Sequence, residues 1–333
     1  MKILVTGGAG YIGSAVAADL VGAGNDVVVY DNLSSGSARA VPKEALLVTG
    51  DLSDGDLLRS VFREHEIAGV LHFAASIEAG ESMKTPEKFF RNNTANTLAL
   101  LEIMLEFDVK RFVFSSTAAV YGNPERTPIL ESDALQPTNA YGESKLLVER
   151  MLQWFHRIHG LCYASLRYFN AAGATKDRGE DHHPESHLIP LVLQVASGQR
   201  SSVAVYGTDY PTPDGTCVRD YIHISDLSNA HLLAYQRLGQ SAEPEGLIYN
   251  LGSGQGFSVR EVVESAARVT ERRIQVDQCP RRPGDPAVLV ASSEKIRKEL
   301  GWAPKVSKLD AIIRSAWMWR QKNPEGYGKA TTQ

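Results

Sequence analysis

The chain has 333 residues, a net charge of −4 at pH 7 and 43% hydrophobic residues. This length supports a large core and two domains, and the balanced charge gives no basic excess that would indicate binding to nucleic acid or an anionic membrane. We expect neither a signal peptide nor a membrane span, because no apolar stretch has the required length. Three separated cysteines, Cys162, Cys217 and Cys279, form no metal or redox spacing, which predicts a reduced, cytoplasmic protein.

The first 31 residues contain a dinucleotide-binding pattern. A short apolar run at residues 3–5 leads into Gly7, Gly10 and Gly13, and a helical pattern follows directly. Glycines at this spacing permit a tight turn, a close approach of the backbone to a pyrophosphate and close packing of helix on strand. Asp31 follows the next apolar run, where its carboxylate can accept both ribose hydroxyls and would repel a 2′-phosphate. The pattern therefore predicts binding of NAD rather than NADP.

Apolar runs alternate with helical patterns through the first half of the chain, which predicts an α/β protein with a Rossmann-like, doubly wound parallel sheet. Polar or small residues follow nearly every run, at the edge of the sheet where ligands bind. The predicted strands are residues 3–5, 27–30, 45–48, 69–73, 112–114 and 164–168, and the predicted helices are residues 14–23, 57–65, 87–106 and 141–159.

The composition changes after residue 170, where Gly, Pro, His and Asp become frequent. We predict an NAD-binding domain over 1–170 and a smaller, mixed α/β substrate domain over 171–323. Segments near 221–248 are expected to pack back on the first domain. A flexible tail is expected over 324–333, because glycine and proline are frequent there.

Tyr141 and Lys145 are four residues apart in a predicted helix and therefore lie on one helix face. A phenol with a pKa near ~10 is a poor base at neutral pH. A nearby ammonium and a positively charged nicotinamide favour the phenolate, so the tyrosine can exchange a proton with a substrate hydroxyl. Alone, this spacing is common on solvated helices, but here it follows a nucleotide pattern and a Ser-Ser-Thr strand end at Thr117.

Across nearly its whole length the sequence resembles the extended short-chain dehydrogenase/reductase family, and within it the UDP-glucose 4-epimerases. First-half motifs are typical of the superfamily, and those of the second half are typical of nucleotide-sugar enzymes. The motifs are Thr6-Gly-Gly-Ala-Gly-Tyr-Ile-Gly13, Asp31-Asn32, Gly50-Asp51-Leu52, His72-Phe73-Ala74-Ala75, Asn92-Asn93, Ser115-Ser-Thr-Ala-Ala-Val-Tyr-Gly122, Tyr141-x-x-x-Lys145, Arg167-Tyr-Phe-Asn170, His187-Leu-Ile-Pro190, Asp214-Gly-Thr-Cys-Val-Arg-Asp-Tyr-Ile-His223 and Arg281-Arg-Pro-Gly-Asp285.

The resemblance implies interconversion of UDP-glucose and UDP-galactose. Tyr141 would take the proton of the sugar 4-hydroxyl while C4 passes hydride to tightly held NAD. The 4-keto sugar would turn over and receive the hydride on its other face. Thr117 would hydrogen-bond the 4-oxygen. The residues implied to bind NAD are Gly7, Gly10, Tyr11, Ile12, Gly13, Asp31, Asn32, Asp51, Leu52, Phe73, Ala74, Ala75, Asn92, Tyr141, Lys145 and Phe169.

The same resemblance implies a UDP-sugar site formed mainly by the second half. Arginine is suited to the diphosphate because its guanidinium group binds phosphate oxygens bidentately. Arg219 and Arg282 are implied to do so, with Asp285 on the uridine ribose and Tyr206 beside the uracil. The remaining implied contacts are Thr117, Asn170 in the phosphate-sugar region, His187 and Leu188 over the nucleotide, and Leu289 at the sugar pocket.

Two positions depart from the family pattern. Ile77 stands where some 4-epimerases have a lysine near the cofactor phosphates, which bears on cofactor affinity. Leu289 stands at the gate of the sugar pocket, where a tyrosine restricts the substrate and smaller residues admit N-acetyl sugars. A leucine is intermediate, so activity on UDP-N-acetyl sugars is left open.

Three other functions compete with this interpretation. A 4,6-dehydratase resembling its relatives would have an Asp-Glu pair after the active-site threonine, whereas Thr117 is followed by Ala118 and Ala119, which transfer no protons. A UDP-glucuronate epimerase or decarboxylase would need a cation for the C5 carboxylate, and the sequence identifies none. A non-catalytic NAD sensor would have no need of Tyr141 with Lys145.

Six candidate metal ligands fall within Glu180-Asp-His-His-Pro-Glu-Ser-His187. Hydride transfer of this kind needs no metal, so we expect a polar active-site loop and no metal. The family also usually forms homodimers by pairing two helices of each subunit. The candidates here are residues 87–106 and 141–159, where Leu98, Leu101 and Leu105 would supply an apolar face or pack on the sheet.

Overall fold

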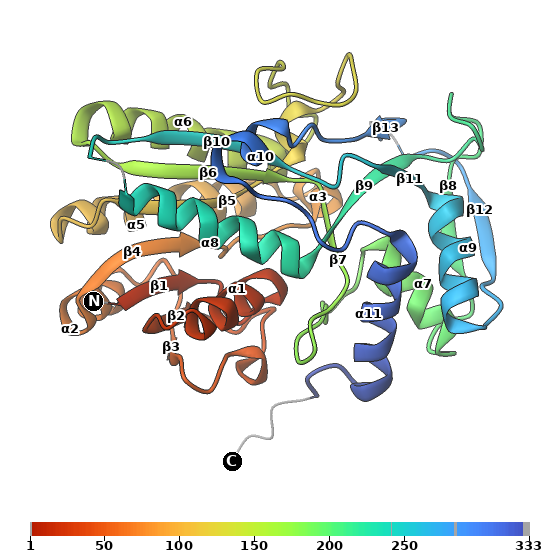
Figure 1. Ribbon diagram of the computed structural model, residues 1–333, viewed down its shortest axis with the longest axis horizontal. Coiled ribbons are helices and arrows are strands. Elements are labelled where there is room, and N and C mark those ends of the chain that lie inside the picture. The colour runs from red at the N-terminus through yellow and green to blue at the C-terminus, as the bar shows by residue number, and fades with distance from the viewer. Residues whose placement is uncertain (1, 241, 283–284, 329–333) are drawn as a thin grey trace.

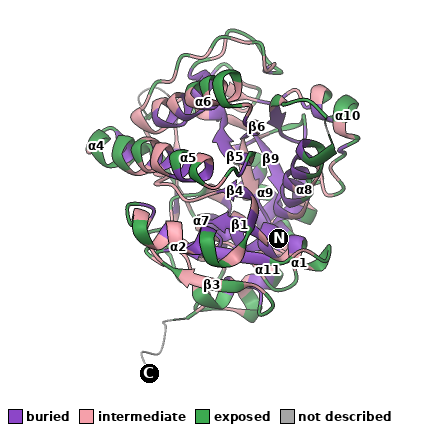
Figure 2. Ribbon diagram, turned by 90° about the vertical axis from the view of Figure 1, so that its left-hand side faces the viewer, coloured by how far each residue is buried: buried purple, intermediate pink, exposed green. Residues whose placement is uncertain are grey.

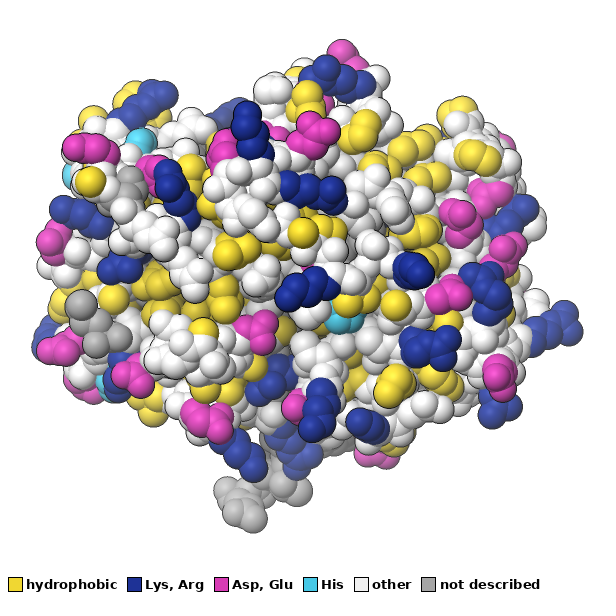
Figure 3. Space-filling model, viewed as in Figure 1, with side chains coloured by type: hydrophobic (Ala, Val, Ile, Leu, Met, Phe, Trp, Pro, Cys, Tyr) yellow, Lys and Arg dark blue, Asp and Glu magenta, His cyan; other side chains and the backbone are white. Residues whose placement is uncertain are grey.

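The computed structural model describes residues 2–240, 242–282 and 285–328. Figure 1 shows a large twisted sheet between helices, with a smaller group of strands and helices beside it. This arrangement confirms the predicted α/β class, the Rossmann-like sheet and the smaller mixed region. On the face in Figure 3, positive and negative side chains are interspersed. No helix of the described residues has the length and apolar character needed to cross a membrane.

The large sheet has seven parallel strands in the order β10-β6-β5-β4-β1-β2-β3. The order of connection reverses beside β1, which pairs with β2 on one side and with β4 on the other. Open parallel sheets bind ligands at such a switch point, beyond the carboxyl ends of the strands. The strands are β1 (Lys2–Thr6), β2 (Val27–Asp31), β3 (Leu46–Thr49), β4 (Ile67–His72), β5 (Arg111–Thr117), β6 (Cys162–Tyr168) and β10 (Gly246–Leu251).

Helices cover both faces of this sheet because alternate strand residues point to opposite sides. Ile3 and Val5 of β1 pack in one cluster with α1 (Tyr11–Gly22) and α8 (Ile224–Gln240). Leu4 packs in the cluster on the opposite face of the sheet. The helices of that cluster are α2 (Gly55–His65), α5 (Asn96–Glu106) and α6 (Ala140–His159). Figure 2 shows the buried strands between these exposed helix faces.

The smaller region combines a four-stranded sheet around β9, a two-stranded sheet and three helices that share one core. Its strands are β7 (Asn170–Ala172), β8 (Val203–Tyr206), β9 (Val218–His223), β11 (Gly256–Ser258), β12 (Val276–Cys279) and β13 (Val288–Leu289). The helices of this core are α7 (Leu188–Ala196), α9 (Val259–Thr270) and α11 (Leu309–Lys322). Elsewhere lie α3 (Ala79–Ser82), α4 (Pro86–Phe89), α10 (Glu294–Leu300) and the short turns η1 (Ala38–Ala40) and η3 (Ala118–Tyr121).

The chain returns to the large sheet after β9. α8 starts at Ile224 and packs against α1, and β10 then extends the sheet beside β6. The strand that precedes this return, β9, belongs to the smaller region, where it pairs with β7, β11 and β13. The second half of the sequence therefore contributes to both parts of the fold.

The single helix predicted over 87–106 is wrong. The structure has α4, then a wider π-helical turn, η2 (Phe90–Ala95), and then α5. The turn directs the side-chain amide of Asn93 to the backbone of Ser76. The oxygen of this amide accepts a hydrogen bond from the Ser76 N–H at 2.8 Å, and its nitrogen donates to the Ser76 carbonyl at 2.9 Å. Periodicity does not reveal such a turn because it is held by a partner distant in sequence.

The tail predicted to be flexible, 324–333, makes specific contacts within its described residues, 324–328. The amide of Tyr327 donates to Asp181 at 2.8 Å, and Arg39 donates to the carbonyl of Tyr327 at 2.8 Å. The ring of Tyr327 also lies 5.3 Å from that of Trp319. Residues 329–333 of the predicted flexible tail lie outside the described residues.

Candidate active site

The glycine turn after β1 forms a cradle at the switch point. Gly7 has a φ of 70°, and a Cβ there would lie 2.4 Å from the amide nitrogen of Ala74 beyond β4. A Cβ on Gly13 would lie 2.2 Å from the carbonyl oxygen of Gly7. Gly10 directly precedes α1, whose first residues are Tyr11 and Ile12. Only glycine fits these approaches, and the helix N-terminus so exposed attracts a pyrophosphate.

Asp31 ends β2 with a buried carboxylate beside this cradle. One of its oxygens accepts from the amide of Ala9 at 2.9 Å and the other from the amide of Leu33 at 2.8 Å. Burial raises the pKa of Asp31, and these two amides oppose the rise. Each carboxylate oxygen has a second lone pair, so the group can also accept the two ribose hydroxyls.

Asn32 and Asp51 lie together beyond β2 and β3. The Asn32 amide donates to Asp51 at 2.6 Å, and the Ser53 hydroxyl, the largest influence, lowers the pKa of Asp51. Leu52 is placed differently from its neighbour. It packs in the core beneath α2, with 5% of its surface exposed, and offers little of its side chain to a ligand.

Three small or apolar positions follow β4 on the other side of the crevice. The amides of Phe73 and Ala74 both donate to the carbonyl of Thr6, at 2.9 and 3.1 Å, so this strand end is fixed against β1. Ala75 comes next. Asn92 reaches the same segment from η2, where its amide donates to the hydroxyl of Ser76 at 3.3 Å.

Thr117, Tyr141 and Lys145 meet at the carboxyl end of β5. Thr117 is its last residue, and its hydroxyl accepts from the amide of Ala119 at 3.1 Å. Tyr141 lies in the first turn of α6, and Lys145 follows one turn later, as predicted. Burial raises the pKa of the Tyr141 phenol. A hydrogen bond with the nearby Thr117 side chain partly offsets this rise.

Burial dominates the electrostatics of the two ionisable groups. It raises the pKa of Tyr141 and lowers the pKa of Lys145 to about 7. The expected lowering of the phenol pKa by Lys145 is therefore not expressed in the protein alone. A further carboxylate, Glu78, adds to the rise for Tyr141, and this residue was not identified from the sequence.

On the substrate side, several implied residues pair with one another. Arg219 of β9 forms an ion pair with Asp285, whose side chain is 28% exposed. The guanidinium of Arg282 lies 3.9 Å from the centroid of the Tyr206 ring. The amide of Asn170 donates to the carbonyl of Asp220 at 3.0 Å. Pro283 and Gly284 of the same motif lie outside the described residues.

Leu289 lies between these residues and α6. It lies opposite Arg219 in the register of β13 and β9. Leu289 and Phe169 both pack against a cluster that includes Leu146, the neighbour of Lys145. The residue predicted to limit the sugar pocket thus packs against the same apolar cluster as the residue that follows Lys145.

His187 and Leu188 lie where α7 begins. The Nδ1 atom of His187 faces two carboxylates of its own loop, at 2.8 Å from Glu180 and 3.1 Å from Glu185. The contacts of this nitrogen are therefore with its own loop and not with Arg219 or Arg282.

A buried ion pair behind the site was not identified from the sequence. Glu149 of α6 and Arg167 of β6 are 1% and 2% exposed and bond each other, and Glu149 also accepts from the hydroxyl of Ser116 at 2.5 Å. The Tyr121 hydroxyl accepts from Arg167 at 2.8 Å. The sequence did offer a signal for this pair, because Glu149 and Arg167 stand among apolar residues that are buried. Charged side chains are rarely buried without a partner.

The sequence matches the NAD dependent epimerase/dehydratase family over residues 3–252. A UDP-glucose 4-epimerase of Streptomyces lividans is 55% identical over 327 residues, which cover 98% of each chain. A crystal structure of a UDP-glucose 4-epimerase is 50% identical with a TM-score of 0.96, and the match covers 99% of this chain and 100% of that one. A structure from Bifidobacterium longum, in complex with NAD+ and UDP, is 39% identical with a TM-score of 0.93, covering 98% and 100%.

Proposed function

Because this chain belongs to the NAD dependent epimerase/dehydratase family, we propose that it interconverts UDP-glucose and UDP-galactose with NAD as its cofactor. The observation that supports this most strongly is the meeting of Tyr141, Thr117 and Lys145 beside the glycine cradle. A nucleotide and a hydroxyl-bearing carbon can therefore be held together at one edge of the sheet.

The residues around the cradle fit NAD. The close backbone approaches at Gly7 and Gly13 leave room for a pyrophosphate, and the buried carboxylate of Asp31 has lone pairs for ribose hydroxyls. NAD held by these residues would supply the acceptor for the C4 hydride and the donor that gives the hydride back to the opposite face of the 4-keto sugar. The cofactor contacts proposed here are the sixteen residues implied by the resemblance, among which Leu52 exposes only 5% of its surface.

We propose that Tyr141 removes the proton of the 4-hydroxyl and returns it in the second half of the cycle. The Thr117 hydroxyl bonds the 4-oxygen and holds it at the phenol. Lys145 lies on the same helix face, where its ammonium binds the ribose beside the nicotinamide and stabilises the phenolate. Burial disfavours both charged forms in the protein alone, so the phenolate also depends on the positive charge of the bound nicotinamide.

For the substrate we propose that Arg219 and Arg282 bind the diphosphate, while Asp285 binds the uridine ribose and Tyr206 lies against the uracil. The ion pair between Arg219 and Asp285 supports this assignment, because it holds the Asp285 side chain beside Arg219 of β9. Asn170 binds the phosphate-sugar region, and His187 and Leu188 cover the nucleotide from the start of α7.

We infer that the sugar pocket also admits UDP-N-acetyl sugars. The side chain at its gate is Leu289, which is smaller than a tyrosine and packs with Phe169 in an apolar cluster. An acetamido group would then find both space and apolar contact.

We further propose a cytoplasmic homodimer with one active site in each subunit. On α6, the residues Leu147, Met151, Trp154 and Ile158 repeat at helical spacing on one face, and Trp154 and Ile158 are 61% and 68% exposed. Leu101 of α5 is buried against the sheet, so it belongs to the core and not to this face.

We keep the division of the chain at residue 170 as a proposal, with α8 and β10 counted with the first domain.

The test is to incubate the purified protein with UDP-galactose and no added NAD. We expect UDP-glucose to form, because the cofactor is retained through each turnover. A Tyr141→Phe variant should remain folded and bind NAD but lose about 10²–10⁴-fold in rate, while Tyr163→Phe, at the opposite end of the sheet, should not. Full activity in the Tyr141 variant would refute the proposed proton transfer. A second incubation with UDP-N-acetylgalactosamine tests the breadth assigned to Leu289.

A further inference from the structure

Four side chains of one loop converge between β7 and α7. They are Glu180, His182, Glu185 and His187, and one oxygen or nitrogen of each lies within 4.8 Å of all the others. Glu180 Oε1 is 3.2 Å from His182 Nδ1 and 2.8 Å from His187 Nδ1, and His187 Nδ1 is 3.1 Å from Glu185 Oε1. The loop folds so that the side chains at positions 180, 182, 185 and 187 come together.

We propose that this cluster, here called the Glu-His cluster, binds a zinc ion. This goes beyond the proposed epimerase activity, which uses no metal, and it replaces our expectation of a merely polar loop. Structural zinc is bound by four imidazole, carboxylate or thiolate groups, at about 2.0–2.2 Å for nitrogen and oxygen, almost always in a tetrahedron. A tetrahedron of that radius has edges of roughly 3.4 Å. The three separations above are somewhat shorter than that edge, and every separation among the four ligand atoms is at most 4.8 Å.

The Glu-His cluster can match the charge of a divalent cation once its histidines are ligands. Metal-bound imidazoles are neutral, so the two carboxylates would then leave two negative charges for zinc to balance, and zinc binding would release any protons held by the histidines. Two ligand carboxylates are shielded from water, since the side chains of Glu180 and Glu185 are 8% and 6% exposed. His187 is 44% exposed and leaves a path by which the ion can enter.

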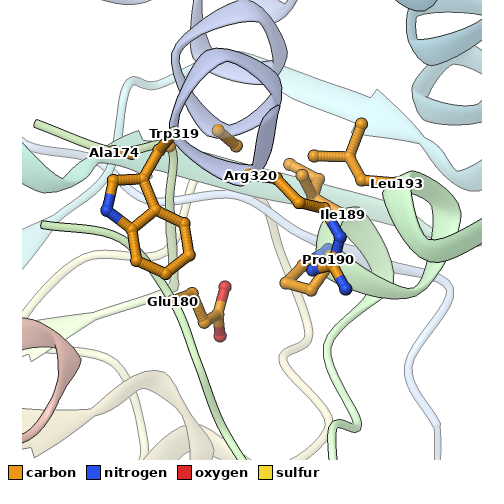
Figure 4. Close-up of a pocket in the computed structure, with 9 residues that line it drawn as sticks. Ala174, Glu180, Ile189, Pro190, Leu193, Trp319 and Arg320 are labelled. Carbon is orange, nitrogen blue, oxygen red and sulfur yellow. The ribbon is translucent and has the colours of Figure 1, made fainter. Parts of the chain in front are cut away.

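The surroundings orient the carboxylates. The amides of Ser186 and His187 both donate to Glu185 Oε1 at 2.8 Å, and hydrogen bonds of this kind hold ligands in place around a metal. Glu180 lines a cavity of about 20 Å³, where Trp319 and Pro190 lie on either side of its carboxylate. Figure 4 shows Glu180 among Trp319, Ile189 and Pro190, with the charged Arg320 beside Pro190.

The position of the Glu-His cluster indicates a structural role. The ring of His182 lies 6.3 Å from that of Tyr11, edge to face, and the hydroxyl of Tyr11 donates to the carbonyl of Gly173 at 2.7 Å. Tyr11 belongs to the glycine cradle, and α7 begins just after His187. A zinc ion held by the loop would therefore fasten the cofactor cradle to the first helix of the smaller region.

Zinc content and zinc titration test the proposal on the full chain with its NAD. The chain is purified, treated with a chelator, and titrated with ZnCl₂ by calorimetry. We expect one zinc ion per chain, a higher melting temperature with zinc than with the same concentration of MgCl₂, and visible absorption typical of tetrahedral coordination when CoCl₂ is used instead.

Matched variants of the same loop provide the controls. His182→Ala and Glu185→Gln should each weaken zinc binding at least ~10-fold, whereas His183→Ala should not, because His183 is 82% exposed and pairs with Asp181. Circular dichroism and retained NAD establish that each variant is folded. No zinc binding by the wild type, equal binding by His182→Ala, or equal loss in His183→Ala would each overturn the site. Epimerase activity that persists without zinc leaves the proposed function intact, so the two proposals fail separately.

Discussion

The Nζ atom of Lys145 donates to the backbone carbonyl of Ser115 at 2.9 Å, with only 2% of the lysine exposed. Its ammonium also lies 4.9 Å from the centroid of the Phe114 ring. The lysine is thereby held at the carboxyl end of β5 next to Thr117. These contacts do not replace the hydration that burial removes, so the pKa of Lys145 is lowered to about 7.

This pKa predicts a pH-dependent stability when NAD has been removed. Between pH 7 and about 10, Lys145 is neutral in the folded protein and protonated in the unfolded chain, which therefore binds more protons. Stability should rise with pH over that window, by up to about 1.4 kcal/mol per pH unit from this group. Below pH 7 both states are protonated, and the contribution should be constant.

Lys145→Met isolates the effect. We expect the wild type to gain stability relative to this variant as the pH rises from 7 to 9, measured by urea unfolding at each pH. Lys110→Met, at an exposed lysine, controls for the loss of a charge. A difference between wild type and Lys145→Met that does not change with pH would contradict the prediction.

Asp31 should determine both the affinity for NAD and the preference for it over NADP. Replacing it by alanine removes the acceptor of two ribose hydroxyls and also leaves the amides of Ala9 and Leu33 without their partner. Hydrogen bonds to a charged group contribute about 1.5–3 kcal/mol, so we expect affinity for NAD to fall roughly 10–100-fold.

Binding of NAD and NADP to Asp31→Ala is measured by titration after the bound nucleotide has been removed. Discrimination against NADP should shrink, because the repulsion of the 2′-phosphate is lost. Asp26→Ala, at the exposed residue before β2, is the matched control. Unchanged NAD affinity in Asp31→Ala would exclude the assigned ribose contact.

Glu149 and Arg167 should hold the catalytic edge together. Removing one partner of a buried pair costs about 3–5 kcal/mol, because the other charge stays buried without compensation. Glu149→Leu leaves the charge of Arg167, whose side chain is 2% exposed, buried without its partner. It also removes the hydrogen-bond acceptor of the Ser116 hydroxyl, next to Thr117. We expect a clearly lower melting temperature, measured by calorimetry, whereas Arg150→Ala at the exposed neighbouring position should change it little. Equal melting temperatures for Glu149→Leu and wild type would show that the pair is dispensable.

The apolar face of α6 should determine the oligomeric state. With Trp154 and Ile158 both changed to glutamate, charges would be buried in the proposed dimer contact, so the protein should become monomeric. Light scattering at micromolar concentration should give twice 36.4 kDa for the wild type and 36.4 kDa for the variant. Met318→Glu alters an equally exposed apolar residue on α11 and should leave the dimer intact. A monomeric wild type would refute the proposed homodimer.

Features encoded within one strand-turn-helix unit were predictable from the sequence alone. The cradle at Gly7 and Gly13 requires residues that lack a Cβ, and Asp31 must follow the next strand to reach the ribose. Tyr141 and Lys145 share a face because 3.6 residues complete a helical turn. Such features depend on spacing along the chain, so the sequence determined the class of fold, the cofactor and the placement of Tyr141 and Lys145 on one helix face.

Other features depended on which distant segments become neighbours. The pairing of Arg219 with Asp285, the buried contact of Glu149 with Arg167, and the π-helical turn held by Asn93 are fixed by the order of strands and the packing of helices on them. The eight-residue loop at 180–187 showed its candidate ligands in the sequence, but only its folded path brings four of them within 4.8 Å. Burial likewise arises only in the tertiary structure, which is why the low pKa of Lys145 was decided there and not by its place four residues after Tyr141.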